Sequence, residues 1–221
     1  MNRLLLLSIT LVILTTSCTS KYAIKGNANL NQLSGKTIYL KSVGDNSSWV
    51  TIDSAQIIHG EFQMRGKTLS TPQMVTLFMD QTPLTPLVLE PGNINISITS
   101  SGLTIHGTPL NNKLYSFYEE NQALERQLRE NTSFACEEIH HSFMNAHQSL
   151  IREFMNLNQD NILAPTIYSI YQTQYPELFN SEDFQSATSS DTPIFNDTHL
   201  IHQFIKASHF KENYPNGFFL W

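Results

Sequence analysis

The sequence predicts an α+β protein: an N-terminal antiparallel β-sandwich-like or barrel-like domain, followed by an antiparallel helical region. Segments with apolar residues at every second position, separated by Gly, Pro, Asn and Ser, run from residue 21 to 106. Beyond residue 110 the apolar residues recur with the period of a helix. The composition is globular, since 40% of the 221 residues are hydrophobic and 14% are charged.

The first residues indicate export. The apolar run from Leu4 to Leu14 has the length of a signal-peptide core and is shorter than the roughly 20 residues of a membrane-spanning helix. It is followed by "TTSC", which resembles the lipobox of bacterial lipoproteins, with Thr15 where that motif favours Leu. We expect a lipoprotein-type signal peptide over residues 1–17 and lipidation of Cys18. An ordinary signal peptide before a chance Cys is the alternative.

The residues after Cys18 bear on the compartment. In Bacteroidetes-type lipoproteins an acidic run at this place resembles a surface-export signal, and "TSKY" contains none. We therefore expect an envelope protein anchored in the membrane by lipid and facing the periplasm, with surface exposure as the alternative. Each buried methylene of an acyl chain adds about 0.8 kcal/mol, so several chains on Cys18 form a firm anchor.

The β domain is expected over residues 18–108. Turn residues divide it into about eight strands, which we place at 22–26, 36–43, 49–58, 60–66, 72–79, 85–92, 93–100 and 102–107. Prolines lack a backbone N–H, so strand starts and turns are the expected places for Pro72, Pro83, Pro86 and Pro91.

The stretch "DSAQIIHGEFQMRG", residues 53–66, predicts a hairpin with its turn at His59-Gly60. Its apolar side chains are expected in the core: Ile52 just before it, then Ala55, Phe62 and Met64. Asp53 is expected to bond backbone N–H groups at the strand end. A catalytic role with Ser54, Glu61 and His59 is the alternative, but local crowding does not define a triad.

The helical spacer is expected over residues 109–177. We place the first helix at 111–130 and the third at 164–175. The second helix lies between them and begins after an N-cap from Asn131, Thr132 and Ser133. The second helix has an apolar stripe of Ile139, Phe143, Ala146, Leu150, Phe154 and Leu157. Residues 178–221 are expected to form a linker, mobile over 180–197, and a C-terminal helix and tail.

The charge is unevenly distributed. Residues 18–108 contain six Lys/Arg and five Asp/Glu, a net charge of +1, whereas residues 109–221 contain six and fourteen, a net charge of −8. The sequence has no basic stripe, which argues against nucleic-acid binding. The acidic half could meet a basic protein partner in the envelope, and a solvated surface is the alternative.

Four pieces in this order resemble one family: "GKTIYL", "TIDSAQIIHGEFQMRG", "PLVLEPGNINISI" and "IHGTPLNN". Over about residues 20–115 the chain is similar to domain of unknown function 4369. In that family the β domain usually stands at the N-terminus of Bacteroidetes-type lipoproteins, before a helical spacer and a thioredoxin-like domain with a Trp-Cys-x-x-Cys motif. The segment "NQDNILAPTIY" resembles part of the spacer.

The sequence departs from this pattern because it contains no Cys-x-x-Cys. The oxidoreductase activity that the resemblance implies therefore transfers to no residue here. We expect a non-enzymatic binding or interaction module with no catalytic residue, cofactor or metal, and the sequence identifies no small-molecule ligand. The alternative is the N-terminal portion of a split or truncated thiol–disulfide oxidoreductase.

Three further patterns were weighed. Gly35-Lys36-Thr37 lacks the preceding Gly and the following helix of a phosphate-binding loop. The second helix contains one Glu-x-x-His, at Glu138 and His141, whereas di-iron bundles use two. Other histidines could form an adventitious metal site, but surface or half-buried histidines without a metal are favoured: His140, His147, His199, His202 and His209. Cys136, beside Ile139, is expected to be a buried structural thiol, with a redox-active or intermolecular thiol as the alternative.

Overall fold

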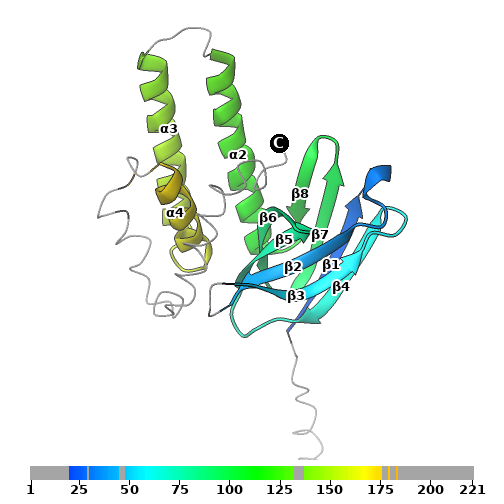
Figure 1. The fold of residues 1–221 in the computed structure, drawn as a ribbon. Helices are drawn as coiled ribbons and strands as arrows, with labels where there is room; N and C mark the ends of the chain where they lie inside the picture. The colour runs from blue at the N-terminus through cyan, green and yellow to red at the C-terminus, as the bar shows by residue number, and fades with distance from the viewer. Residues whose placement is uncertain are drawn as a thin grey trace, which may run out of the picture.

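The computed structural model describes residues 20–28, 30–44, 48–131, 137–175, 179 and 183. It shows two four-stranded sheets within residues 21–106, followed by three helices (Figure 1). This confirms the predicted α+β class and the sandwich-like β domain. No helix among the described residues is long and apolar enough to cross a membrane.

One sheet, called sheet 1, has the strand order β4 (Glu61–Lys67), β1 (Lys21–Ala28), β7 (Gly92–Thr99), β8 (Gly102–His106). Sheet 2 has the order β3 (Trp49–Gln56), β2 (Thr37–Val43), β5 (Gln73–Met79), β6 (Thr82–Leu89). A short 3-10 turn, η1 (Asn31–Leu33), joins β1 to β2.

The expectation of a purely antiparallel domain is wrong at one pair of strands. Five of the six strand pairs are antiparallel, but β1 and β7 run parallel, with Ile24 opposite Ile94. Parallel neighbours need a long crossover rather than a tight turn. Here β2 to β6, which fill sheet 2 and one edge of sheet 1, supply it, and sequence alternation alone does not show such a pairing.

The main core lies between the two sheets. Inward residues alternate with exposed ones along β1, β4 and β7, and the core includes Ile24, Leu40, Leu77, Leu87 and Ile94, all fully buried. Phe62 and Met64 belong to this core and Ala55 packs against it, as predicted.

Ile52 was predicted to face the core and does not. Leu40 pairs with Asp53 and Lys41 with Thr51, so Ile52 is the extra residue of a β-bulge and is 37% exposed. A bulge shifts the alternation of side chains along its strand. Ile57 fills the core instead and is only 1% exposed.

Pro86 lies inside β6 rather than at a strand start or turn, whereas Pro83 is the second residue of this strand. Sheet 2 ends at β6, and an edge strand tolerates proline because one side of its backbone has no strand partner.

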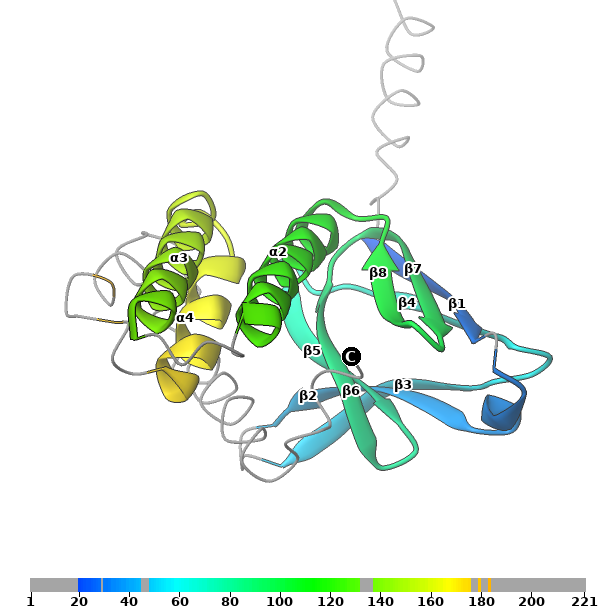
Figure 2. The same ribbon diagram turned by 90° about the horizontal axis from the view of Figure 1, so that it is seen from above.

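The helices are α2 (Pro109–Asn131), α3 (Glu137–Asn156) and α4 (Leu163–Gln174). Figure 2 shows α2 beside the sandwich, with α3 and α4 on the side of α2 that faces away from the sheets. A second core joins Met74 and Val88 of sheet 2 to buried side chains of all three helices, among them Phe117, Ile151 and Ile167.

The predicted stripe of α3 is displaced around the helix. The buried face contains His147, Ile151 and Met155, whereas Ala146 and Leu157 of the predicted stripe are exposed. A polar residue at the centre of the inward face explains the displacement, because a stripe chosen by hydrophobicity omits His147. Asn131, an expected N-cap of this helix, is instead the last residue of α2.

Two residues beyond α4 pack against the helices. The Phe179 ring meets Tyr168 edge to face at 5.3 Å. The Arg152 guanidinium donates two hydrogen bonds to the Asp183 carboxylate, at 2.7 and 2.8 Å. The other residues from 176 onward, and with them the predicted C-terminal helix and tail, lie outside the described residues.

Candidate functional site

Residues 53–66 connect the two sheets. Ile58 and Glu61 exchange backbone hydrogen bonds of 2.9 and 3.0 Å around His59 and Gly60, whose φ angles are 52° and 79°. Two positive φ values are typical of a tight hairpin turn, so the predicted turn is confirmed. Beyond this single bridge the strands separate, because β3 belongs to sheet 2 and β4 to sheet 1.

Asp53 bridges the sheets. Its Oδ2 accepts a hydrogen bond of 2.8 Å from the Tyr22 hydroxyl of β1, and its Oδ1 accepts one of 2.8 Å from the Ser54 N–H. Burial, followed by the hydrogen bond to Asp53 and its negative charge, raises the pKa of Tyr22. The phenol is therefore protonated at neutral pH and donates to Asp53. His59 is an exposed turn residue, and this arrangement is structural rather than a catalytic triad.

Two aromatic residues pack over glycines on the neighbouring strand. Tyr22 lies opposite Gly66, and Phe62 lies opposite Gly26. A Cβ at Gly66 would be 2.6 Å from the Tyr22 ring, and one at Gly26 would overlap the Phe62 ring. These glycines are therefore required by close packing. The Phe of "GEF" covers Gly26 of β1, and the Gly that follows, Gly66, makes room for Tyr22 of β1.

Helix α2 is fixed to the β domain by Glu90 and Asn111. The buried Glu90 Oε1 accepts hydrogen bonds from the N–H groups of Leu110, at 2.8 Å, and Asn111, at 3.2 Å. The Asn111 Nδ2 donates to the Val88 carbonyl at 2.7 Å, and its Oδ1 accepts the Val88 N–H at 2.9 Å. A carboxylate at a helix N-terminus is favourable, since it meets unpaired N–H groups and the positive end of the dipole.

The same junction has two further contacts. Asn111 Nδ2 also donates to Thr108 Oγ1 at 2.7 Å, and Asn112 Oδ1 accepts the Gly107 N–H at 2.8 Å. A Cβ at Gly107 would overlap the Asn93 carbonyl, and its φ is 113°. The stretches "LEPG" and "GTPLNN" entered the sequence analysis only through the family resemblance. Their contact with each other in the fold was not predicted.

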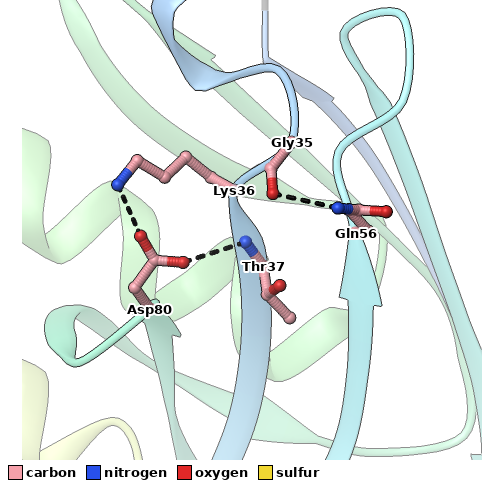
Figure 3. A network of polar contacts seen from close by, with 5 residues as sticks. All are labelled: Gly35, Lys36, Thr37, Gln56 and Asp80. Atoms are coloured by element: carbon pink, nitrogen blue, oxygen red, sulfur yellow. Dashed lines mark hydrogen bonds and ion pairs between the residues drawn. The ribbon is translucent and has the colours of Figure 1, made fainter.

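Gly35-Lys36-Thr37 belongs to a surface network between strand ends (Figure 3). Lys36 Nζ lies 2.6 Å from Asp80 Oδ2, and the Thr37 N–H donates to Asp80 Oδ1 at 3.1 Å. These two contacts hold the pKa of Asp80 below its usual value. Gln56 donates to the Gly35 carbonyl at 3.1 Å. Strand β2 begins at Thr37, where a phosphate-binding loop would need a helix.

The described residues contain no group of three His, Cys, Asp or Glu side chains arranged to hold a metal ion. His141 is exposed. His147 is buried, with ring centroids of Phe143, Tyr171 and Tyr175 at 5.0–5.5 Å. Five predicted candidates lie outside the described side chains: Glu138, His140, His199, His202 and His209. Cys18 and Cys136 also lie outside them.

The helical region has a groove between α2 and α3, with a cavity volume of about 430 Å³. One wall includes Leu150 and Phe154 of α3 and Leu157 just after its end, and Leu157 is 69% exposed. The wall from α2 includes Lys113 and Glu120. Polar and charged side chains, among them Glu153 and Asn158, line the groove together with the apolar ones.

The fold and these sites define a β-sandwich domain with a helical unit fixed to one side. Residues 22–114 match the family model described as Domain of unknown function (DUF4369), and this part of the chain is such a domain. The matched range includes Asp53, Gly66, Glu90 and Asn111, so the inter-sheet bridge and the helix junction fall inside it. No curated protein matches the chain.

Proposed function

We propose that this protein is a lipid-anchored, non-enzymatic interaction module of the cell envelope, facing the periplasm. The observation that carries the anchor is the apolar run followed by "TTSC", which makes Cys18 the attachment point. The groove between α2 and α3 supports the interaction role. The hydrogen bonds of Glu90 and Asn111 hold α2 against the β domain, so the groove has a defined position relative to that domain.

Membrane fractionation and labelling with a radioactive fatty acid test the anchor. Cys18→Ala is expected to lose the label and to leave the membrane fraction. Cys136→Ala is the matched control and is expected to keep the label and to remain in the membrane fraction. A Cys18→Ala protein that keeps its fatty-acid label would refute lipidation at this residue.

Site-specific photo-crosslinking in cells tests the groove. A photoreactive residue in place of Leu157, in the groove, is expected to capture a protein partner. The matched control is Leu69, which is 63% exposed on the β domain. Equal crosslinking at both positions, or none at Leu157, would contradict the proposal.

A second proposal follows from the family match at residues 22–114 together with the resemblance stated above. In it, the chain is the N-terminal portion of a split or truncated thiol–disulfide oxidoreductase from a Bacteroidetes-type organism. A reading frame that continues after codon 221 into Trp-Cys-x-x-Cys would support this proposal. A stop codon that is not followed by a reading frame encoding Trp-Cys-x-x-Cys would contradict it. Insulin reduction by the purified chain would contradict the non-enzymatic proposal.

A further inference from the structure

Basic side chains gather on the outer face of sheet 1. Of the six Lys/Arg between residues 18 and 108, four point outward from its two neighbouring strands β1 and β4: Lys21, Lys25, Arg65 and Lys67. All four are exposed, while the residues between them, such as Tyr22, Ile24 and Met64, are buried between the sheets. Figure 2 shows sheet 1 as a layer separate from sheet 2, so this face lies on the outside of the sandwich.

The strand register brings these charges together. Lys21 lies directly opposite Lys67, and Arg65 lies opposite Ala23, one step along the face from both lysines of β1. Like charges directly opposite each other on a sheet are destabilising, and diagonal neighbours are only about 7–8 Å apart. The face therefore concentrates positive potential at a cost in stability.

No ion pair within the described part of the chain neutralises the four cations of this face. None of the four cations has an ion-pair partner there, whereas the remaining two of the six are engaged: Lys36 with Asp80, and Lys41 over the ring of Phe78. One acidic residue, Glu61, lies on the outward side of β1 and β4; it lies opposite Asn27, diagonal to Lys25 and at the other end of β4 from Lys67.

The face lies next to the proposed anchor. Lys21 follows Cys18 by three residues, which span no more than about 11 Å when extended. The Thr68 N–H donates to the Ser20 carbonyl at 3.0 Å, which fixes the chain beside Lys67 before β1 begins. Acyl chains on Cys18 would hold Lys21, and Lys67 opposite it, about one Debye length from the membrane surface, where they still sense its charge.

We propose that the outer face of β1 and β4, formed by Lys21, Lys25, Arg65 and Lys67, docks on an anionic phospholipid surface. The proposal rests on the proposed lipid anchor for its position and on charge complementarity for its partner. Basic residues beside an anchor add electrostatic attraction to anionic headgroups.

The docking also orients the molecule. Figure 2 shows α2, α3 and α4 to one side of the two sheets, so the helical half does not cover the outer face of β1 and β4. Residues 109–221 carry a net charge of −8, so an anionic surface repels the helical half while it attracts this face. Docking therefore favours orientations in which the outer face of β1 and β4, rather than the helical half, meets the lipid.

Vesicle co-sedimentation tests the face without any acyl group. The probe protein is the chain from residue 18 onward with Cys18→Ser, which keeps every residue that the structure describes. It is expected to bind vesicles of equimolar phosphatidylcholine and phosphatidylglycerol but not vesicles of phosphatidylcholine alone. The bound protein is expected to dissociate as the salt concentration increases. Arg65→Gln with Lys67→Gln should weaken the partition coefficient roughly 30-fold, since each basic residue contributes about fivefold.

The matched control is Lys36→Gln with Arg126→Gln, which removes the same charge from exposed positions outside this face and outside the groove, and should leave binding unchanged. Equal loss in both double variants, or no binding to anionic vesicles, would overturn the proposal. Inorganic phosphate that displaces the protein better than sodium chloride of equal ionic strength would indicate a discrete phosphate site and would also overturn it. Because the probe carries no lipid, its failure is separate from a failure of Cys18 labelling.

Discussion

The side chain of Asn111 pairs with the backbone of Val88 as a neighbouring strand would. It accepts the Val88 N–H at 2.9 Å and donates to the Val88 carbonyl at 2.7 Å, at the free edge of β6. An open strand edge carries unpaired backbone groups that favour aggregation. One residue of α2 thus satisfies part of the sheet edge and fixes the helix to it.

Asn111→Ala is expected to lower the free energy of unfolding by about 2–4 kcal/mol, because the buried N–H and C=O of Val88 lose their partners. Denaturant unfolding measures this change. Asn145→Ala, at an exposed position of α3, should change stability by no more than about 0.5 kcal/mol. Similar costs for the two variants would show that the pairing with Val88 contributes little.

Glu90 gives a graded test of the helix cap. Glu90→Ala removes the acceptor of two N–H groups of α2 and is expected to cost about 1–2 kcal/mol of unfolding free energy. Glu90→Gln keeps an acceptor oxygen but loses the charge that meets the helix dipole, and should cost about 0.3–1 kcal/mol. Thermal or denaturant unfolding of both variants at neutral pH measures the order, and a Gln variant less stable than the Ala variant would contradict the capping role.

Tyr22→Phe tests the bridge between the sheets. The pKa of Tyr22 is raised by burial and by Asp53, whereas a tyrosine in the unfolded chain ionises near pH 10. Its contribution to stability is therefore fully present below about pH 10 and is lost as the pH rises further, because the unfolded chain releases the proton first. Tyr22→Phe should be about 1–2 kcal/mol less stable at neutral pH. It should also show a shallower loss of stability above pH 10, and an unchanged alkaline slope would refute the bridge.

Gly66→Ala tests the packing of Tyr22 on its neighbouring strand. The added Cβ would lie 2.6 Å from the Tyr22 ring, so we expect a loss of about 1–3 kcal/mol of unfolding free energy. In the background of Tyr22→Leu, the same glycine substitution should cost clearly less, since the ring is gone. Strictly additive costs in this double-mutant cycle would show that the two residues do not interact.

Much of the β domain could be predicted from local pattern. Alternation and turn residues predicted about eight strands, and His59-Gly60 was correctly placed in the turn because positive φ angles favour such residues. Helical periodicity located α2 and α4 to within a few residues. Each of these features depends on neighbours within a few positions along the chain.

Long-range features could not be predicted in the same way. The bulge that turns Ile52 outward depends on how β3 pairs with β2, and the inward face of α3 depends on aromatic rings of α4 that surround His147. The parallel pairing of β1 with β7 joins strands that are about 70 positions apart along the chain. An apolar pattern shows which side chains are hydrophobic, but it does not show which distant part of the chain each of them contacts.

The sequence by itself determined the fold class, the strand and helix segments, the family resemblance and the candidate anchor at Cys18, since all of these depend on local order and composition. Only the tertiary structure placed Asp53 against Tyr22, Asn111 against Val88, and four cations on one face of sheet 1. Sheet register and the packing of helix on strand bring together residues that are far apart in the chain. The free energy of those contacts therefore arises only once both surfaces are formed.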